Sequence, residues 1–268
     1  MRKLLPSAGR GRSWSASRRF HGWLATWLQD RRRSRAQDVA APGAGPGGLG
    51  GCRLWLDAAT LLLNDGDPVA FWEDQSGHGN NVVSEFGLGP EFDTDVFGAC
   101  VAFNGNMYLV CETALMPQPF TVLVVGEFAA AMDEFESPRL SIFCGGFMTA
   151  FYTSELHDGD LSLYTTGADS RTVPGTLTYD TPCTVAVTAV GNGVAGSLFA
   201  NGVKATLNGA FMANNGNGFD DAFYVGTWSA GQWPIVGRIA ELVVYDRALS
   251  DGEVATLHTL LAAKWGIE

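Results

Sequence analysis

The chain has 268 residues, of which 46% are hydrophobic, and it carries a formal net charge of −11. This length and composition support a packed core and exclude a chain that is disordered throughout. Charges, Gly, Asn or Pro interrupt every apolar run before it reaches the roughly 18 residues of a membrane-spanning helix. We therefore do not expect the chain to be an integral membrane protein. With 34 glycines and only 17% charged residues, the composition favours short strands and turns over a helical bundle.

The charge is divided unevenly along the chain. Residues 1–36 contain ten Lys and Arg against the single acid Asp30, a formal charge of +9. Residues 37–268 contain seven Lys and Arg against 27 Asp and Glu, a formal charge of −20. A body this acidic repels phosphate backbones, so we expect no nucleic-acid partner and favour cations or neutral ligands.

Residues 1–40 are predicted to be a basic amphipathic leader. Apolar side chains recur on one face of a helix, and Arg residues flank them on both sides. This stripe comprises Phe20, Trp23, Leu24, Trp27 and Leu28. A basic, acid-poor amphipathic segment is typical of organelle transit peptides, and a retained one suits an anionic membrane surface. We expect organelle targeting, with contact to a membrane surface or to import machinery; an extracellular or surface location and a disordered tail are the alternatives.

Residues 41–51, with the sequence APGAGPGGLGG, are predicted to be a linker, because Pro and Gly disfavour helix and sheet. Gly43, Gly45 and Gly48 match the G-x-G-x-x-G spacing of dinucleotide-binding loops. No strand precedes them, so we expect no nucleotide site there.

From residue 52 to residue 268 the sequence alternates short apolar runs with turns. Twelve runs have the composition of strands, at residues 53–56, 69–72, 99–103, 108–111, 120–128, 140–143, 147–152, 161–164, 184–190, 197–200, 222–226 and 238–245. Asn-Gly pairs, such as those that begin at Asn192 and Asn201, supply the positive φ angles of tight hairpin turns. Strands without intervening helices predict an all-β sandwich of two antiparallel sheets and disfavour a parallel α/β fold.

The last segment of the chain is predicted to be an α-helix. Ser250 and Glu253 have the spacing of a capping box. Lys264 suits the negative end of the helix dipole, and Gly266 can end the helix. The predicted apolar stripe comprises Val254, Leu257, Leu260 and Leu261. We expect the helix to cover a face or an edge of the sandwich.

Five cysteines, an odd number, lack the C-x-x-C spacing of zinc ribbons. They are Cys52, Cys100, Cys111, Cys144 and Cys183. We expect most of them to be buried thiols, because free cysteine packs like a small apolar residue; at most two disulfides are the alternative.

The segment 74–81, with the sequence DQSGHGNN, is predicted to be a stiff turn. In such a turn the Asp74 carboxylate accepts hydrogen bonds from backbone N–H groups. A metal loop is the alternative interpretation. We expect His78 at the surface of the turn, because no second His or Cys lies at metal-ligand spacing.

Three blocks of the sequence resemble a known family. They are LWLDAATLLLNDGDPVAFWEDQSGHGNN, GSLFANGVKA and VGRIAELVVYDRALSDGEVATLHTLLAAKWG, within residues 52–267. These blocks resemble the laminin-G-like domains of the concanavalin A-like lectin and glucanase group. The resemblance implies a jelly roll for residues 52–268. It also implies recognition of carbohydrates, protein ligands or surfaces, in some members with Ca²⁺.

Glycan-cleaving enzymes that share this fold carry acids in the pattern E-x-D-x-x-E along one strand. That pattern does not occur here. The nearest acid clusters, Asp133 with Glu134 and Glu136, and Asp158 with Asp160, are predicted to be solvated loops. We therefore predict a protein that is not an enzyme, with a glycan hydrolase or lyase as the least favoured alternative.

Residues 214–221, with the sequence NNGNGFDD, form a candidate metal loop. Their oxygen-rich side chains suit Ca²⁺, but their spacing fits no EF-hand loop. The sequence predicts no definite cofactor, and Ca²⁺ bound by this loop is the alternative.

The next loop carries the candidate ligand-binding residues. Trp228 and Trp233 flank the segment SAGQ. We predict that their indole rings stack on a sugar while Asp220, Asp221 or Gln232 binds its hydroxyl groups. The alternative is that one or both Trp side chains pack beneath the loop.

We therefore predict a non-catalytic recognition or adhesion module, which binds a glycan or protein ligand through loops along one edge of the sandwich. A structural subunit of a larger assembly, tethered by the leader helix, is the second hypothesis.

Overall fold

The computed structural model describes residues 43–85, 87, 89–113, 115, 118–129, 139–145, 149–154, 159–218, 222–228 and 232–267. These residues belong to one compact unit, Ala41–Glu268. The predicted leader, the acid cluster at residues 133–136, and Asp158, Asp220 and Asp221 lie outside the described residues.

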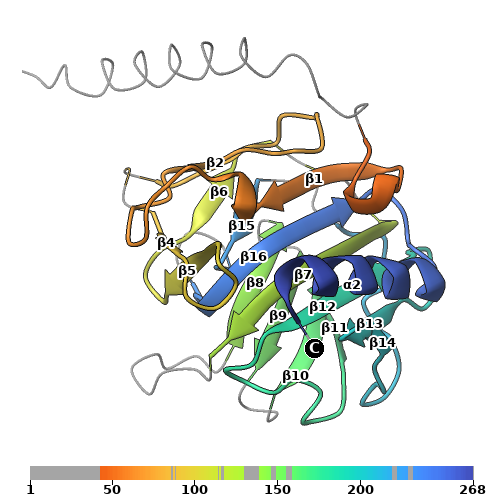
Figure 1. Cartoon of the computed structure of the whole chain (residues 1–268). Helices are drawn as coiled ribbons and strands as arrows, with labels where there is room; N and C mark the ends of the chain where they lie inside the picture. Colours follow the sequence, from red (N-terminus) through yellow and green to blue (C-terminus); the bar gives the residue numbers. More distant parts are fainter. Residues whose placement is uncertain are drawn as a thin grey trace, which may run out of the picture. The chain divides into compact units, whose positions relative to one another are not determined.

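The described chain folds as two antiparallel sheets, which confirms the predicted all-β sandwich (Figure 1). Sheet I has the spatial order β14 (Val203–Lys204), β13 (Ser197–Ala200), β12 (Cys183–Ala189), β7 (Phe120–Phe128), β16 (Val236–Tyr245), β5 (Cys100–Asn104) and β4 (Glu91–Asp93), with β1 (Cys52–Asp57) also paired to β16. Sheet II has the order β11 (Ala168–Arg171), β10 (Asp160–Thr165), β9 (Thr149–Ser154), β8 (Arg139–Gly145), β15 (Phe223–Val225), β6 (Leu109–Cys111), β3 (Val82–Val83) and β2 (Phe71–Trp72).

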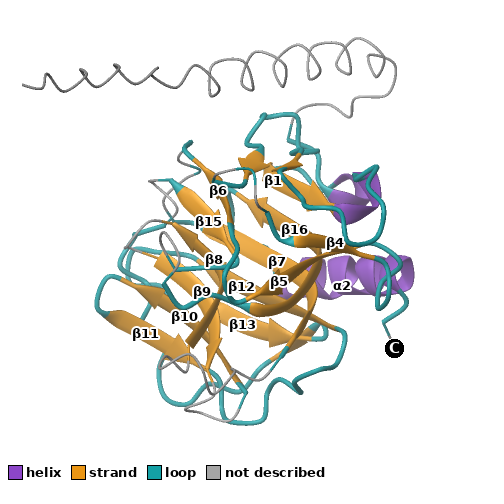
Figure 2. Cartoon of the chain, turned by 90° about the vertical axis from the view of Figure 1, so that its left-hand side faces the viewer, coloured by secondary structure: helices purple, strands orange, loops and turns teal. Residues whose placement is uncertain are grey.

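The central strands of sheet I are buried on both faces. Along β7 and β12, all residues except Glu127 are buried. One face of a strand can pack on sheet II, but the other needs a second cover, because side chains alternate between the two faces. The helix α2 (Asp251–Trp265) provides that cover, on the side of sheet I that lies away from sheet II (Figures 1 and 2).

The predicted capping box of α2 is confirmed. The Ser250 side chain accepts a hydrogen bond from the Glu253 backbone, the Glu253 side chain accepts one from the Ser250 backbone, and Gly266 ends the helix in the left-handed conformation. The prediction for Leu260 was wrong, because its side chain is 43% exposed. Leu260 lies about 100° around the helix from the buried stripe, which continues instead to Trp265.

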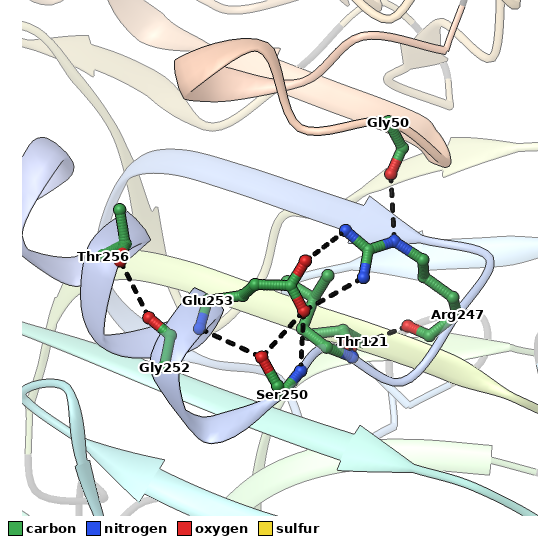
Figure 3. A network of polar contacts seen from close by, with 8 residues as sticks. Gly50, Thr121, Arg247, Ser250, Gly252, Glu253 and Thr256 are labelled. Atoms are coloured by element: carbon green, nitrogen blue, oxygen red, sulfur yellow. Dashed lines mark hydrogen bonds and ion pairs between the residues drawn. The ribbon is translucent and has the colours of Figure 1, made fainter.

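A polar network joins the start of α2 to the strands beneath it (Figure 3). The Arg247 guanidinium donates to both Glu253 carboxylate oxygens, at 3.1 and 2.7 Å, and to the Gly50 carbonyl oxygen at 3.1 Å. The Thr121 hydroxyl on β7 donates to the Arg247 carbonyl oxygen at 2.8 Å and accepts from the Leu249 N–H at 2.9 Å. The network therefore fixes the turn between β16 and α2.

Replacing Glu253 by Gln is expected to lower the free energy of unfolding at pH 7 by about 1 kcal/mol, the usual value of a helix cap. The hydrogen bond from Arg247 lowers the pKa of Glu253 from 4.5 to about 2. A lowered pKa in the folded state stabilises the protein above pH 4.5, and this contribution disappears as the pH falls toward 2. Urea unfolding should therefore show that Glu253→Gln lowers the free energy of unfolding at pH 7 and changes it little at pH 2. The exposed Glu112→Gln is the control, and an equal loss at both pH values would contradict the prediction.

Residues 43–51, part of the predicted linker, lie against the sandwich. The Gly45 N–H donates to the Leu49 carbonyl oxygen at 2.8 Å, and Pro46 is buried in the short 3₁₀ helix η1 (Pro46–Gly48). A Cβ atom on Gly45 would lie 2.5 Å from the Tyr245 hydroxyl oxygen. Glycine here permits close packing, so this described part of the segment is not a free hinge.

The five cysteines are buried, and no disulfide joins any of them. Burial raises the pKa of Cys52, Cys100 and Cys183 to about 12. Since the thiolate is the reactive form, these side chains serve as small apolar packing groups, as the sequence predicts for most of the five.

Candidate functional site

The face of sheet II that points away from the core carries a separate apolar cluster. Along β10, Leu161 and Leu163 belong to the main core, so the residues that alternate with them, Asp160, Ser162 and Tyr164, point to the opposite, outer face. The cluster on that outer face comprises Cys144, Ala150, Tyr152 and Trp228, with Tyr164 and Trp233 packed against it. We call these six residues the outer-face cluster.

Strand register brings the sheet residues of this cluster together. Ala150 on β9 lies opposite Cys144 on β8 and Tyr164 on β10. Tyr152 lies opposite Ser141 on β8. A bulge in β8 between Ser141 and Phe143 shifts the alternation by one residue, so Ser141 and Cys144 share the outer face.

The two tryptophans come from the loop that connects β15 to β16. The Trp228 N–H and the Thr227 hydroxyl both donate to the Gln232 carbonyl oxygen, each at 2.7 Å. The Trp233 carbonyl oxygen accepts from the Ser141 N–H at 3.0 Å, which ties the loop to β8. Trp233 has a φ of 47°, an unfavourable left-handed conformation for a bulky residue. The loop therefore holds Trp233 in a strained conformation, which is more common at functional sites than elsewhere.

The Trp228 ring contacts two other aromatic rings of the cluster, those of Trp233 and Tyr164. The ring centroids of Trp228 and Trp233 are 4.6 Å apart, and those of Trp228 and Tyr164 are 5.1 Å apart. Trp228 is only 7% exposed, whereas Trp233 and Tyr164 are half-buried. Trp228 is thus packed beneath its loop, which was the alternative interpretation, and it supports two rings that reach the surface.

Polar side chains lie beside these rings. The Tyr152 hydroxyl donates to Asp169 Oδ2 at 2.8 Å, and Arg171 Nε lies 3.3 Å from the same oxygen. Asp169 is directly opposite Tyr164, and Arg171 is opposite Ser162. Arg171 and Asp169 side chains are 36% and 22% exposed, so both hydrogen-bond donors and acceptors are available next to the aromatic surface.

Sequence reasoning found part of this arrangement. It singled out Trp228, Trp233 and Gln232, which the structure places in one loop, with Gln232 exposed. Asp220 and Asp221 lie outside the described residues. The binding role of these five residues stays a prediction. Sequence reasoning missed Tyr152, Tyr164, Asp169 and Arg171, of which only the two tyrosines lie in strands that it predicted.

The Asn-rich loop before β15 is fastened by its own amide groups. The Asn215 side chain donates to the Thr165 carbonyl oxygen at 3.1 Å, and the Asn217 side chain donates to the Thr166 hydroxyl at 2.8 Å. Among the described residues, no group of three or more His, Cys, Asp or Glu could hold a metal ion. Because this loop continues into residues 219–221, which the structure does not describe, Ca²⁺ binding there stays a prediction.

A pocket of about 410 Å³ lies at the other sheet. It is lined by Gly43, Ala44, Gly50, Gly51, Cys52, Arg53, His78 and Asp246. Its two charged groups neutralise each other, since Arg53 Nε lies 2.8 Å from Asp246 Oδ2. No aromatic side chain other than the His78 imidazole lines this pocket, so the outer-face cluster is the better candidate for recognition. In the part of the chain that the structure describes, we find no helix of the length and apolarity needed to span a membrane.

Comparison with known proteins shows what the fold of the chain resembles. No family model matches it, and no curated protein matches its sequence. The structure is similar to the Trypanosoma rangeli sialidase, with a TM-score of 0.52 and 16% identity over 92% of this chain and 39% of the sialidase chain. It is also similar to domain 4 of AbnA, a GH43 extracellular arabinanase from Geobacillus stearothermophilus in complex with arabinotriose, with a TM-score of 0.51 and 16% identity over 73% of this chain and 100% of that domain.

These similarities establish the fold. At 16% identity they show a β-sandwich of two antiparallel sheets, as the sequence predicts. The chain spans only 39% of the length of the sialidase that it matches. The more specific laminin-G-like membership is not shown by these matches.

Proposed function

We propose that the chain is a non-catalytic recognition module that binds a glycan at the outer-face cluster. The observation that carries this proposal is the buried Trp228, which holds the half-exposed rings of Tyr164 and Trp233 at the surface. Sugars present apolar C–H faces that stack on aromatic rings, and hydroxyl groups that bind charged planar side chains. Asp169 and Arg171 lie beside the rings and supply such polar partners.

The spacing of acids on this face supports binding over glycan cleavage. Asp169 lies opposite Tyr164, which is four residues along β10 from Asp160. At about 3.3 Å per strand residue, these two positions are about 13 Å apart along the strand direction. Most retaining and inverting glycosidases use a carboxylate pair separated by about 5–5.5 Å or about 6.5–9.5 Å, whereas sialidases use a Tyr nucleophile. The two outer-face acids on β10 and β11 are therefore too widely spaced to act as such a pair.

The fold comparisons agree with a glycan ligand. Domain 4 of AbnA, which is matched over 100% of its length, is described in complex with arabinotriose. A domain of the same architecture can therefore hold a short neutral oligosaccharide. We include arabino-oligosaccharides among the probes below for that reason.

Replacing Trp233 by Ala is expected to weaken glycan binding at least tenfold, because it removes a half-exposed stacking ring. Stability should fall less than on truncation of Trp228, since Trp233 is half-buried whereas Trp228 is 7% exposed; Ala keeps the Cβ atom and therefore the same left-handed φ. Isothermal titration with arabino-oligosaccharides and with galactose- and glucose-based oligosaccharides measures the affinity, and thermal unfolding measures stability. Phe97→Ala, which removes a half-buried ring associated with sheet I, is the matched control and should leave binding unchanged.

Three results would count against the proposed function. The wild-type chain could bind none of these glycans at millimolar concentration. Binding could persist unchanged in Trp233→Ala. Release of new reducing ends from any of the probes would instead identify an enzyme.

A further inference from the structure

We infer that the ligand of the outer-face cluster is a neutral glycan, without carboxylate, sulfate or phosphate groups. This inference rests on the proposed function and specifies its ligand class. It follows from the state of the cations in the sandwich, from the polar pair beside the rings, and from the charge of the body.

The cations of the sandwich are already engaged. Residues 37–268 contain seven Lys and Arg, and six of them have side chains that the structure describes. Each of these six lies within 4 Å of a carboxylate oxygen: Arg53, Arg171, Lys204, Arg238, Arg247 and Lys264. The seventh, Arg139, has a side chain outside the described ones. An anionic sugar usually requires a cation that can give it a charge-assisted hydrogen bond. Each of the described cations already forms an ion pair with an Asp or Glu carboxylate.

The cation nearest the rings illustrates this commitment. Arg171 Nε lies 3.3 Å from Asp169 Oδ2, which also accepts from the Tyr152 hydroxyl at 2.8 Å. An anionic group that approaches Arg171 would come close to the Asp169 carboxylate, and like charges at that distance repel. Asp160 on β10 adds a second acid to the outer face of sheet II.

A neutral sugar uses the same pair without this penalty. Its hydroxyl groups can donate to Asp169 and accept from Arg171, so one paired acid and base serve both roles of a hydroxyl. The formal charge of −20 on residues 37–268 acts in the same direction, because it lowers the local concentration of anionic ligands. We therefore expect this chain to bind acidic sugars weakly, although its fold resembles that of a sialidase.

The experiment compares neutral and acidic members of matched ligand pairs. Lactose is paired with 3′-sialyllactose, and xylo-oligosaccharides are paired with their glucuronic-acid-substituted forms, alongside arabino-oligosaccharides as a further neutral probe. Isothermal titration of the full chain at low and at high salt is expected to show at least tenfold tighter binding of the neutral member of a recognised pair. The affinity for the neutral member should not depend on salt, because no net charge is neutralised.

A charge-release variant tests the cause. Asp169→Asn removes the charge that engages Arg171, while the amide oxygen can still accept from the Tyr152 hydroxyl. The ratio of acidic to neutral affinity is expected to rise at least fivefold at low salt, and to fall again at high salt. Asp251→Asn makes the same change in net charge beside Lys204, at the start of α2, and should leave the ratio unchanged.

The outcomes separate this inference from the proposed function. If the wild-type chain binds an acidic member as tightly as its neutral partner, or if Asp169→Asn leaves the ratio unchanged, a neutral ligand is the wrong class. Loss of such acidic binding in Arg139→Gln would then assign the anion to that side chain. If the chain binds no neutral or acidic glycan, the proposed function itself fails and the ligand class fails with it.

Discussion

Replacing Lys264 by Met is expected to destabilise the protein by about 3–5 kcal/mol, because it leaves a buried carboxylate without its cation. Glu241 on β16 is 0% exposed. Its Oε2 atom accepts hydrogen bonds from Lys264 Nζ and Trp265 Nε1, each at 2.6 Å, and its Oε1 atom accepts from Trp55 Nε1 at 2.6 Å. Lys264 Nζ also lies 2.7 Å from Asp57 Oδ2, so one ammonium group forms ion pairs with two carboxylates.

The pH dependence of the Lys264→Met variant identifies the cause. Burial raises the pKa of Glu241, and the hydrogen bond from Lys264 opposes that effect. A raised carboxyl pKa means that the folded state binds a proton more readily than the unfolded state, so stability falls as the pH rises above 4.5. Removal of Lys264 should enlarge this fall. Urea unfolding should therefore show that Lys264→Met lowers the free energy of unfolding more at pH 7 than at pH 5, because Glu241 is protonated more readily at pH 5.

Two further variants make this test specific. Lys204→Met removes the cation of an exposed ion pair with Asp251, and should cost less than about 1 kcal/mol. Adding Glu241→Gln to Lys264→Met should recover part of the lost stability, because it removes the buried charge. A loss in Lys264→Met that is equal at pH 5 and pH 7 would mean that lost packing of the lysine stem, rather than the Glu241 charge, dominates.

The strands that could be predicted from the sequence are the long, apolar ones. The predicted runs at residues 120–128 and 197–200 coincide with β7 and β13, and the other ten predicted runs overlap strands of the two sheets. The strands β3, β4, β11 and β14 were missed. Each has two to four residues, and β11 (ADSR) and β14 (VK) lack the apolar alternation that marks a strand in isolation. Pairing with longer neighbours, rather than local preference, makes them strands.

The residues of the candidate site could likewise be predicted only where the local sequence marks them. The loop tryptophans could be singled out from composition, and the alternation in residues 161–164 already places Tyr164 on the face opposite Leu163. Asp169 and Arg171 could not be placed, because they lie on the missed strand β11. The bulge in β8 that sets Cys144 on the outer face also has no signature in the sequence.

The ion cluster around Glu241 shows a third kind of limit. The sequence assigned Lys264 to the end of the helix dipole, which is a local role. In the structure Lys264 instead reaches Glu241, 23 residues away, and Asp57, 207 residues away. Such contacts follow from how α2 packs across sheet I, and no spacing along the chain encodes them.

Replacing Asp74 by Ala is expected to destabilise the protein by about 2–4 kcal/mol, because it leaves several donors at a buried turn without an acceptor. Asp74 Oδ1 accepts from the Trp55 and Ser76 N–H groups, each at 2.9 Å. Asp74 Oδ2 accepts from the Asn80 N–H at 2.9 Å and from the Ser76 hydroxyl at 2.8 Å. These contacts confirm the stiff turn predicted from the sequence and fasten it to β1.

The control and the metal test decide between a structural turn and a metal loop. Asp67→Ala removes a carboxylate that caps an exposed turn at Asn64, and should cost less than about 1 kcal/mol. In the wild-type chain, millimolar Ca²⁺ should not change the exchange rates of the Trp55, Ser76 and Asn80 amide hydrogens, because both carboxylate oxygens of Asp74 already face donors. In Asp74→Ala these three amides should exchange faster than in the wild type, by local opening of the turn, while amides at the centre of β7 should exchange only through global unfolding. Protection of the three amides that increases with Ca²⁺ would restore the metal-loop interpretation.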